Sequence, residues 1–204
     1  MLISSVTLPP RNSHQQVSNM PIPDNQLRSW SRQAGGATYH CSTDPKAIQL
    51  DVLSAALESD MLWWAKPLSE EALKRLVENS FCFGLYAEEA DDGGKGASDG
   101  NGTKKPMIGF ARLATDFVTF GYLTDVYVAK EHQGKGLGRW AMECINEALD
   151  TWPDLRRCLI IPGDPNSARL YQTTMGARHL RDAPGGEVPM MEKQGRAYPE
   201  HKHT

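Results

Sequence analysis

The chain has 204 residues, of which 40% are hydrophobic, and a formal net charge of −3 at pH 7. This length and composition suit one globular domain of ordinary size. The acidic balance leaves no basic footprint for nucleic acid or an anionic membrane surface, so we expect neither as a partner. No stretch is apolar enough to cross a bilayer, and the first residues do not resemble a secretory signal. These features predict a cytoplasmic location, with the nucleus left open.

Three stretches interrupt the hydrophobic periodicity of the chain. Residues 1–36 are rich in Ser, Asn, Gln and Pro and end in two glycines, which predicts a flexible N-terminal arm. Residues 88–105 combine Gly, Asp and Ser, a composition typical of a mobile loop. Residues 195–204 form a polar tail. The globular domain is therefore predicted to span residues 37–194.

Strand and helix patterns alternate along this domain, beginning with a short strand near residues 38–42. Two helices follow, and we expect Asp44 with Pro45 to start the first and Ser69 to start the second. Three runs rich in β-formers come next, at residues 81–87, 107–113 and 120–128. They suggest an antiparallel meander.

The period then changes to that of a helix, because apolar residues recur at three- and four-residue spacing from Leu137 to Leu149. An apolar strand at 158–161 follows, and Asp164-Pro165 predicts the start of a last helix that Gly176 ends. A final strand around 188–191 is poorly marked because it contains a proline. The predicted order is β-α-α-β-β-β-α-β-α-β, an α/β (α+β) fold.

The segment from Gln133 to Arg139 is a glycine-rich turn between a strand and a helix. Gly134, Gly136 and Gly138 would let the backbone approach an anion closely, and the unpaired amides of the first helical turn would point toward it. Lys135 and Arg139 add positive charge. The spacing fits neither a Rossmann fingerprint nor a Walker loop, in which Gly-Lys is followed by Ser or Thr. Two linked phosphates would fit such a turn well, and a plain connection between strand and helix is the alternative.

Two motifs in this order resemble those of the GNAT (GCN5-related) acetyltransferases. Gln133-x-x-Gly136-x-Gly138 is similar to the family's Q/R-x-x-G-x-G/A signature, and Ser167-Ala168-Arg169-Leu170-Tyr171 before Gly176 is similar to its A-x-x-L-Y-x-x-x-G element. The resemblance covers about residues 38–180. It implies a mixed, mostly antiparallel sheet of six or seven strands flanked by about four helices, with acetyl-CoA as co-substrate and no metal. Ala177 and Asp164 depart from the family's usual aromatic residue and Asn.

The resemblance also implies a position for the cofactor. The backbone groups of Val126 and Val128 would pair with its pantetheine arm, the turn 133–139 would hold its diphosphate, and Asn166 would bond one of its polar groups. Tyr171 is the implied general acid that protonates the leaving thiolate. An ordinary packing role for Tyr171 against the sheet remains an alternative.

The acceptor side is less determined by the sequence. Asp125 is the carboxylate nearest to the expected reaction centre and is our candidate general base, with Asp116 and Tyr122 in reserve. Strict alternation along the strand would place Tyr122 and Thr124 on one face and Asp125 on the other, so Asp125 could instead anchor the substrate or act through water. Trp63, Trp64 and Tyr122 are candidates for the acceptor pocket, and a hydrophobic cap over the core would use the same tryptophans.

These features together predict an N-acetyltransferase that moves an acetyl group to a primary amine of a small molecule or amino acid. One alternative is a module of the same fold that binds acetyl-CoA as a sensor with little or no turnover. Another is an interaction domain without a cofactor. The poorly marked last strand leaves an edge that a homodimer could complete.

Overall fold

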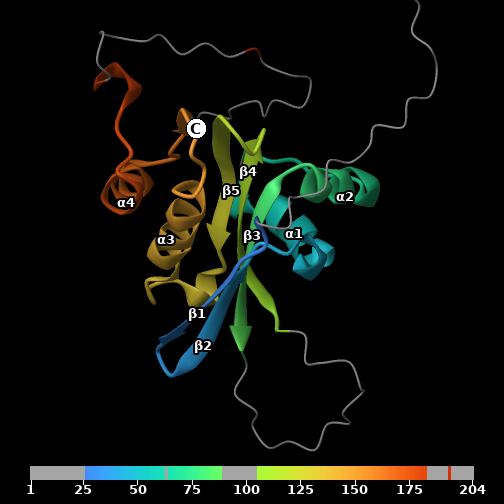
Figure 1. Cartoon of the computed structure of the whole chain (residues 1–204). Helices are drawn as coiled ribbons and strands as arrows, with labels where there is room; N and C mark the ends of the chain where they lie inside the picture. The colour runs from blue at the N-terminus through green and yellow to red at the C-terminus, as the bar shows by residue number, and fades with distance from the viewer. Residues whose placement is uncertain (1–25, 63, 89–104, 183–192, 194–204) are drawn as a thin grey trace, which may run out of the picture.

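The computed structural model describes residues 26–62, 64–88, 105–182 and 193. Within these residues, one six-stranded sheet has its strands in chain order from β1 to β6 (Figure 1). Neighbouring strands are antiparallel except β5 and β6, which are parallel. The strands are Ser29–Ala34 (β1), Ala37–Ser42 (β2), Phe81–Glu88 (β3), Met107–Thr115 (β4), Phe120–Val128 (β5) and Arg157–Ile160 (β6).

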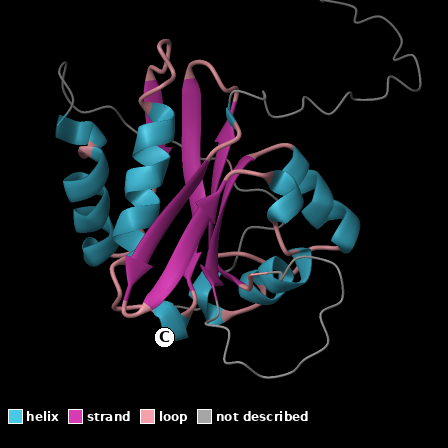
Figure 2. Ribbon diagram, turned by 60° about the horizontal axis from the view of Figure 1, so that its bottom comes forward, coloured by secondary structure: helices cyan, strands magenta, loops and turns pink. Residues whose placement is uncertain are grey.

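Helices cover both faces of the sheet (Figure 2). Two of them, α1 (Leu50–Leu57) and α2 (Glu70–Glu78), lie on one face, and α3 (Leu137–Leu149) and α4 (Pro165–Met175) lie on the other. Each face has its own buried hydrophobic cluster, one beneath α1 and α2 and one beneath α3. The predicted α/β fold, with a mixed and mostly antiparallel sheet, is confirmed.

The predicted N-terminal arm is wrong from Ser29 onward, because β1 forms a hairpin with β2. Gly35 and Gly36 make the two-residue turn, with φ of 58° and 81°, and this pair of positive φ angles suits a tight hairpin of right-handed twist. The side of β1 that faces the core carries Trp30, which stacks on Phe83 at a centroid distance of 6.2 Å. A strand of polar residues with so few apolar side chains resembles an arm when the sequence is considered alone.

Most of the predicted helix boundaries are confirmed. Ser69 Oγ accepts from the amide of Ala72 and starts α2. Asp164 accepts from two first-turn amides of α4, and Gly176, with φ of 63°, ends that helix. Near Asp44 the pattern produces only a short 3-10 turn, Pro45–Ala47, and α1 begins later at Leu50 because Ile48 takes an extended conformation.

Several predictions lie outside the described residues. These are the first part of the arm, the interior of the loop at 88–105, the strand near 188–191 and the polar tail at 195–204. Trp63 also lies outside the described part of the chain.

Tyr86 lies back along β3 over Gly84, on the face that α1 covers. A Cβ atom on Gly84 would collide with the ring and hydroxyl of Tyr86. Tyr86 is only 6% exposed, and its hydroxyl has no hydrogen-bond partner among the described residues. Burial raises the pKa of Tyr86 well above its usual range. Gly84 therefore makes room for a large side chain in the core.

We expect Gly84→Ala to lower the free energy of unfolding by about 1–3 kcal/mol, because the added methyl group overpacks a filled core. Urea denaturation measures this loss. Gly163→Ala is the matched control, since a Cβ there meets no atom within 4 Å, and it should change stability little. Tyr86→Phe should be neutral or stabilising, because it removes a buried hydroxyl without a partner. Equal stability of Gly84→Ala and the wild type would contradict this account of the packing.

Candidate active site

The strands β5 and β6 run side by side only in part. Their parallel register pairs Phe120–Leu123 with Arg157–Ile160, where β6 ends. In the described part of the chain, the rest of β5 has no strand beside it on this edge. β5 then leads to α3 and β6 leads to α4, so the unpaired end of β5 lies between two helix starts. In open α/β sheets, ligands bind in the crevice at the carboxyl ends of parallel strands.

A β-bulge interrupts the pairing of β4 with β5 at Asp125. The register shifts between Phe110 and Arg112, and Asp125 has a φ of 53°, a left-handed conformation that Asp tolerates better than most residues. Thr124 Oγ1 donates to Asp125 Oδ1 at 3.2 Å, so these two side chains meet. The strict alternation that separated the Tyr122 and Thr124 face from Asp125 is therefore wrong at the bulge.

Both carboxylate oxygens of Asp125 accept hydrogen bonds. Arg112 Nε and Nη2 lie 2.8 Å and 2.7 Å from Oδ2, and Trp64 Nε1 donates to Oδ1 at 3.3 Å. Asp125 is 7% exposed, and Arg112 also donates to Ser80 Oγ at 3.3 Å. The ion pair thus joins β4, the β5 bulge and the connection that follows α1.

Arg112 was missed by the sequence reasoning, although a signal was present. It is the one charged residue in the run 107–113, and a charge inside a buried strand requires a partner. Asp125 is the one carboxylate in the neighbouring strand β5. That complementarity could have predicted the pair.

The glycine-rich turn follows β5 through a short 3-10 turn, Lys130–His132. Gly134 and Gly136 have φ of 76° and 74°, and a Cβ on Gly134 or Gly138 would meet no atom within 4 Å. No side chain of the described residues caps the start of α3 at Gly136. The first amides of this helix therefore lack a side-chain acceptor, in an open and positively polarised position that suits an anion.

Gln133 braces this turn, because its Nε2 donates to the carbonyl of Val128 at 2.8 Å. That carbonyl is thus bonded within the chain, which leaves fewer free backbone groups on Val128 than the resemblance implied. The side chains of Val126 and Val128 are half-buried and pack against the core beneath α3. The functional expectation for both residues concerns the backbone alone.

The two expected cations of the turn are placed on different sides of it. Lys135 Nζ donates to the hydroxyl of Tyr39 at 3.2 Å, and Arg139 Nη2 donates to Thr173 Oγ1 on α4 at 3.3 Å. A third cation, Arg32, approaches from β1: its Nη2 lies 3.8 Å from the position that a Cβ on Gly136 would take. Sequence reasoning missed Arg32 because its strand was taken for an arm.

Tyr171 lies on the inner face of α4 and is 8% exposed. Burial, with a smaller contribution from the Asp164 carboxylate, raises the pKa of Tyr171 above its usual value. The side chain therefore keeps its proton at neutral pH and can act as a donor. Asn166 is exposed in the first turn of α4, where its backbone amide donates to Asp164 Oδ1 at 2.7 Å.

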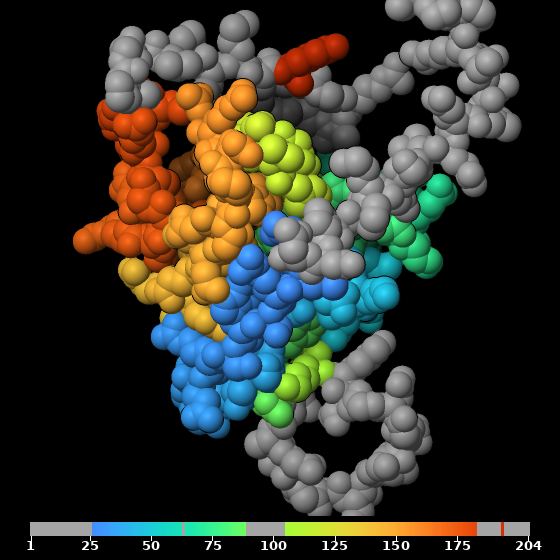
Figure 3. All heavy atoms as spheres, in the orientation of Figure 1, coloured from blue at the N-terminus to red at the C-terminus, as the bar shows by residue number. Residues whose placement is uncertain are grey.

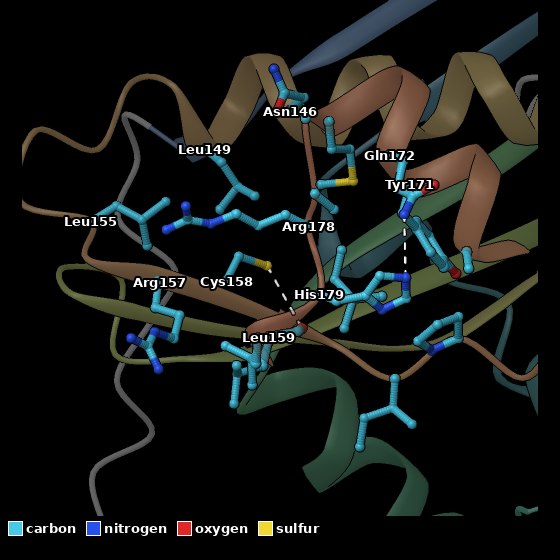
Figure 4. A pocket seen from close by; sticks show the side chains of 18 of the residues that line it. Asn146, Leu149, Leu155, Arg157, Cys158, Leu159, Tyr171, Gln172, Arg178 and His179 are labelled. Atoms are coloured by element: carbon cyan, nitrogen blue, oxygen red, sulfur yellow. Dashed lines mark hydrogen bonds between the residues drawn. The ribbon is translucent and has the colours of Figure 1, made fainter. Parts of the chain in front are cut away.

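Tyr171 also lines a cavity of about 640 Å³ between α3, β6, α4 and residues 177–180 (Figure 4). In the space-filling view, a hollow opens beside α4 on this side of the molecule (Figure 3). Gln172 and His179 approach each other across it at 3.5 Å. No residue of the turn 133–139 lines this cavity, so it is separate from the expected diphosphate site.

The remaining candidates lie in different places. Tyr122 is half-buried and pairs in register with Ala114 on β4 and Leu159 on β6. Asp116 lies in the β4–β5 turn, at the opposite end of β5 from the glycine-rich turn. Its carboxylate accepts from the amides of Val118, Thr119 and Phe120, and these bonds hold its pKa well below its usual range. Asp116 therefore organises its own turn and does not serve as the reserve base.

The described residues contain neither a metal-ligand cluster nor a membrane-spanning helix. In that part of the chain, no group of three or more His, Cys, Asp or Glu residues could hold a metal ion. None of the helices found there is long and apolar enough to span a membrane.

Comparison with known proteins gives concordant matches. The model of the acetyltransferase (GNAT) family matches residues 54–177. A protein of Gibberella zeae whose name assigns it to the acetyltransferases is 41% identical over 180 residues, which cover 82% of this chain and 94% of that protein.

Solved structures agree with this. A GNAT-family protein of Xanthomonas campestris pv. campestris is 26% identical, with a TM-score of 0.51 over 78% of this chain and 94% of that one. A protein of meticillin-resistant Staphylococcus aureus, at 19% identity and a TM-score of 0.51 over 75% and 99% of the two chains, shares the fold. The glycine-rich turn, the sheet that carries it and these matches together show that the chain belongs to the GNAT family of acetyltransferases.

Proposed function

We propose that this protein is an acetyl-CoA dependent N-acetyltransferase that acts on a primary amine of a small molecule or amino acid. The observation that carries the proposal is the open, uncapped glycine-rich turn at the start of α3, beside the unpaired end of β5. We further propose direct attack by the amine in a ternary complex. A cytoplasmic location and a homodimer stay predictions.

The residues of the turn fit the diphosphate of this co-substrate. Glycines without neighbouring atoms leave room for phosphate oxygens, and the first amides of α3 would donate to them. Lys135 and Arg139 would add charge, while backbone groups of Val126 and Val128 that are not bonded within the chain would bind the pantetheine arm. Asn166 would bond a polar group near the start of α4. When bound, acetyl-CoA supplies an acetyl group activated as a thioester.

Tyr171 is the proposed general acid. Its hydroxyl stays protonated because burial raises its pKa, and it would give its proton to the leaving sulfur. Proton transfer by a positioned side chain contributes about 10²–10⁴-fold to the rate of such reactions.

Asp125 has a more complicated position. A primary amine whose ammonium form has a pKa near 10 is protonated at neutral pH and must lose that proton before it attacks. Asp125 is the candidate base for this step. Its oxygens already accept from Arg112, Trp64 and Thr124. These bonds favour an anchoring role over that of base, and we propose that Asp125 anchors the acceptor side by holding Trp64 against β5 rather than by contacting the substrate itself. Trp63 and Tyr122 remain proposed members of the acceptor pocket.

The same bonds favour a second candidate function, a GNAT module that binds acetyl-CoA with little turnover. A screen of purified protein with acetyl-CoA and a panel of small amines, read out as release of free thiol, separates the two. Amine-dependent release supports the enzyme. If coenzyme A stabilises the protein in a thermal melt but no amine causes release of thiol, the binding module is supported. If millimolar coenzyme A does not stabilise the protein, both candidate functions are excluded.

We expect Tyr171→Phe to lower kcat by about 10²–10⁴-fold while the Kd for coenzyme A changes little, because the ring is kept and only the proton donor is lost. Thiol release and calorimetry measure the two quantities. The ordinary pKa of a tyrosine is about 10, and burial raises that of Tyr171 in the folded protein. Any fall in wild-type kcat that is caused by loss of the Tyr171 proton should therefore lie above pH 10. An unchanged kcat in Tyr171→Phe would refute the assignment.

The role of Asp125 can be tested with its partner. Asp125→Asn should cost about 3–5 kcal/mol of stability, because it leaves the half-buried Arg112 without a counter-charge. Asp125→Asn combined with Arg112→Met removes both charges and should recover much of that loss. Urea denaturation measures both.

Activity of the double variant then separates the two roles. If Asp125 is an anchor, the double variant should keep kcat within about tenfold of the wild type. If Asp125 is the base, kcat of the double variant should fall by about 10²-fold or more. That result would restore Asp125 as the base.

A further inference from the structure

We propose that Arg32, on β1, binds the diphosphate of the cofactor together with the turn that starts α3. This rests on the proposed function and adds to it a residue outside the motifs of the turn. The Arg32 side chain is contributed by the N-terminal hairpin, far from Gly136 in sequence and adjacent to it in space.

The strand β1 runs along α3, and its direction places Arg32 beside the start of that helix. Arg28 Nη2 donates to Thr151 Oγ1 at 3.1 Å, just beyond the C-terminal end of α3. Trp30 Nε1 donates to Glu147 Oε2 at 3.0 Å, one turn earlier. Arg28, just before β1, and then Trp30 and Arg32 on β1 thus lie progressively nearer the start of the helix, where the guanidinium of Arg32 lies beside Gly136. Figure 1 shows the hairpin of β1 and β2 extending along this side of the sheet, beside α3.

The charge around Arg32 is uncompensated. No hydrogen bond or ion pair joins the side chain of Arg32 to another described residue, whereas the side chains of Arg28 and Arg112 both have partners. None of the ion pairs among the described residues includes Lys135 or Arg139 either. Several cations therefore gather at the positive end of a helix dipole. Such an arrangement is unfavourable until an anion binds.

The register of the hairpin also links Arg32 to Lys135, a residue of the turn. Arg32 pairs directly with Tyr39 on β2, and the hydroxyl of Tyr39 accepts from Lys135 Nζ at 3.2 Å. The two cations are thus held by adjoining strands on one side of the turn. Because a guanidinium donates two parallel hydrogen bonds to a phosphate, Arg32 is suited to a direct contact.

The test measures the Kd of three ligands by calorimetry: coenzyme A, dephospho-coenzyme A and acetylpantetheine, which lacks the diphosphate. In Arg32→Gln we expect the Kd for coenzyme A and for dephospho-coenzyme A to rise by about tenfold each, the loss of one charge-assisted contact. The Kd for acetylpantetheine should not change. Arg32→Lys should recover part of the affinity, since it keeps the charge without the fork.

Kinetics gives an independent readout. Arg32→Gln should raise the KM for acetyl-CoA by a similar factor and leave kcat unchanged, because the contact is the same in the ground state and the transition state. Arg28→Gln is the matched control, on the same side of β1 with its partner at the far end of α3. It should leave all three Kd values near those of the wild type. Thermal melts without ligand show whether either variant has lost its fold.

Three outcomes would overturn the proposal: an unchanged Kd for coenzyme A in Arg32→Gln, a loss confined to coenzyme A that points to the 3′-phosphate, and an equal loss in Arg28→Gln. Failure of the proposed function has a different signature. In that case the wild-type protein itself would not bind coenzyme A.

Discussion

At Asp125 the backbone of β5 takes a left-handed conformation, and the residue is held there by an ion pair with Arg112 on the neighbouring strand. Conformations of this kind persist only where the surrounding contacts determine them. A bulge bends its strand and increases the local twist, and it is close to this point that the pairing of β5 with β6 stops. The ion pair therefore helps to fix the strand edge that would receive the pantetheine arm in the proposed function.

The same strand leads through a short 3-10 turn to the proposed anion site at the start of α3. The bond from Gln133 to the Val128 carbonyl closes the turn against the end of β5, and α3 is anchored behind it by a continuous buried face. The amides at the start of α3 are consequently oriented before any ligand arrives. A pre-formed site loses little conformational entropy on binding, which leaves more of the contact energy for affinity.

The sequence predicted those features that depend on local rules. The caps at Ser69 and Asp164 follow from side-chain chemistry within one turn, and the glycine-rich turn follows from spacing alone. The β5 bulge did not follow, because a register shift depends on the partner strand and violates the period of two on which the alternation argument relied.

The hairpin of β1 was missed for a related reason. Its residues are polar on the outside and make few apolar contacts, so burial gave too weak a signal to distinguish it from an arm. The sequence pattern predicts that the arm ends at Gly35-Gly36, whereas in the structure these two glycines, with positive φ angles, form a hairpin turn. Because the hairpin was assigned to the arm, Arg32 could not be placed near Gly136 by sequence reasoning.

The distribution of charge reconciles an acidic protein with an anionic co-substrate. A net charge of −3 would weakly repel coenzyme A at long range, but such repulsion is screened within about 8–10 Å at physiological salt. Inside that distance, at the site we propose, the ligand would meet the cations Arg32, Lys135 and Arg139 and the positive end of α3, and none of the observed ion pairs of the described residues includes these cations. At such a site local charge would outweigh net charge, and selection for an anion would depend on where the basic residues lie rather than on how many there are.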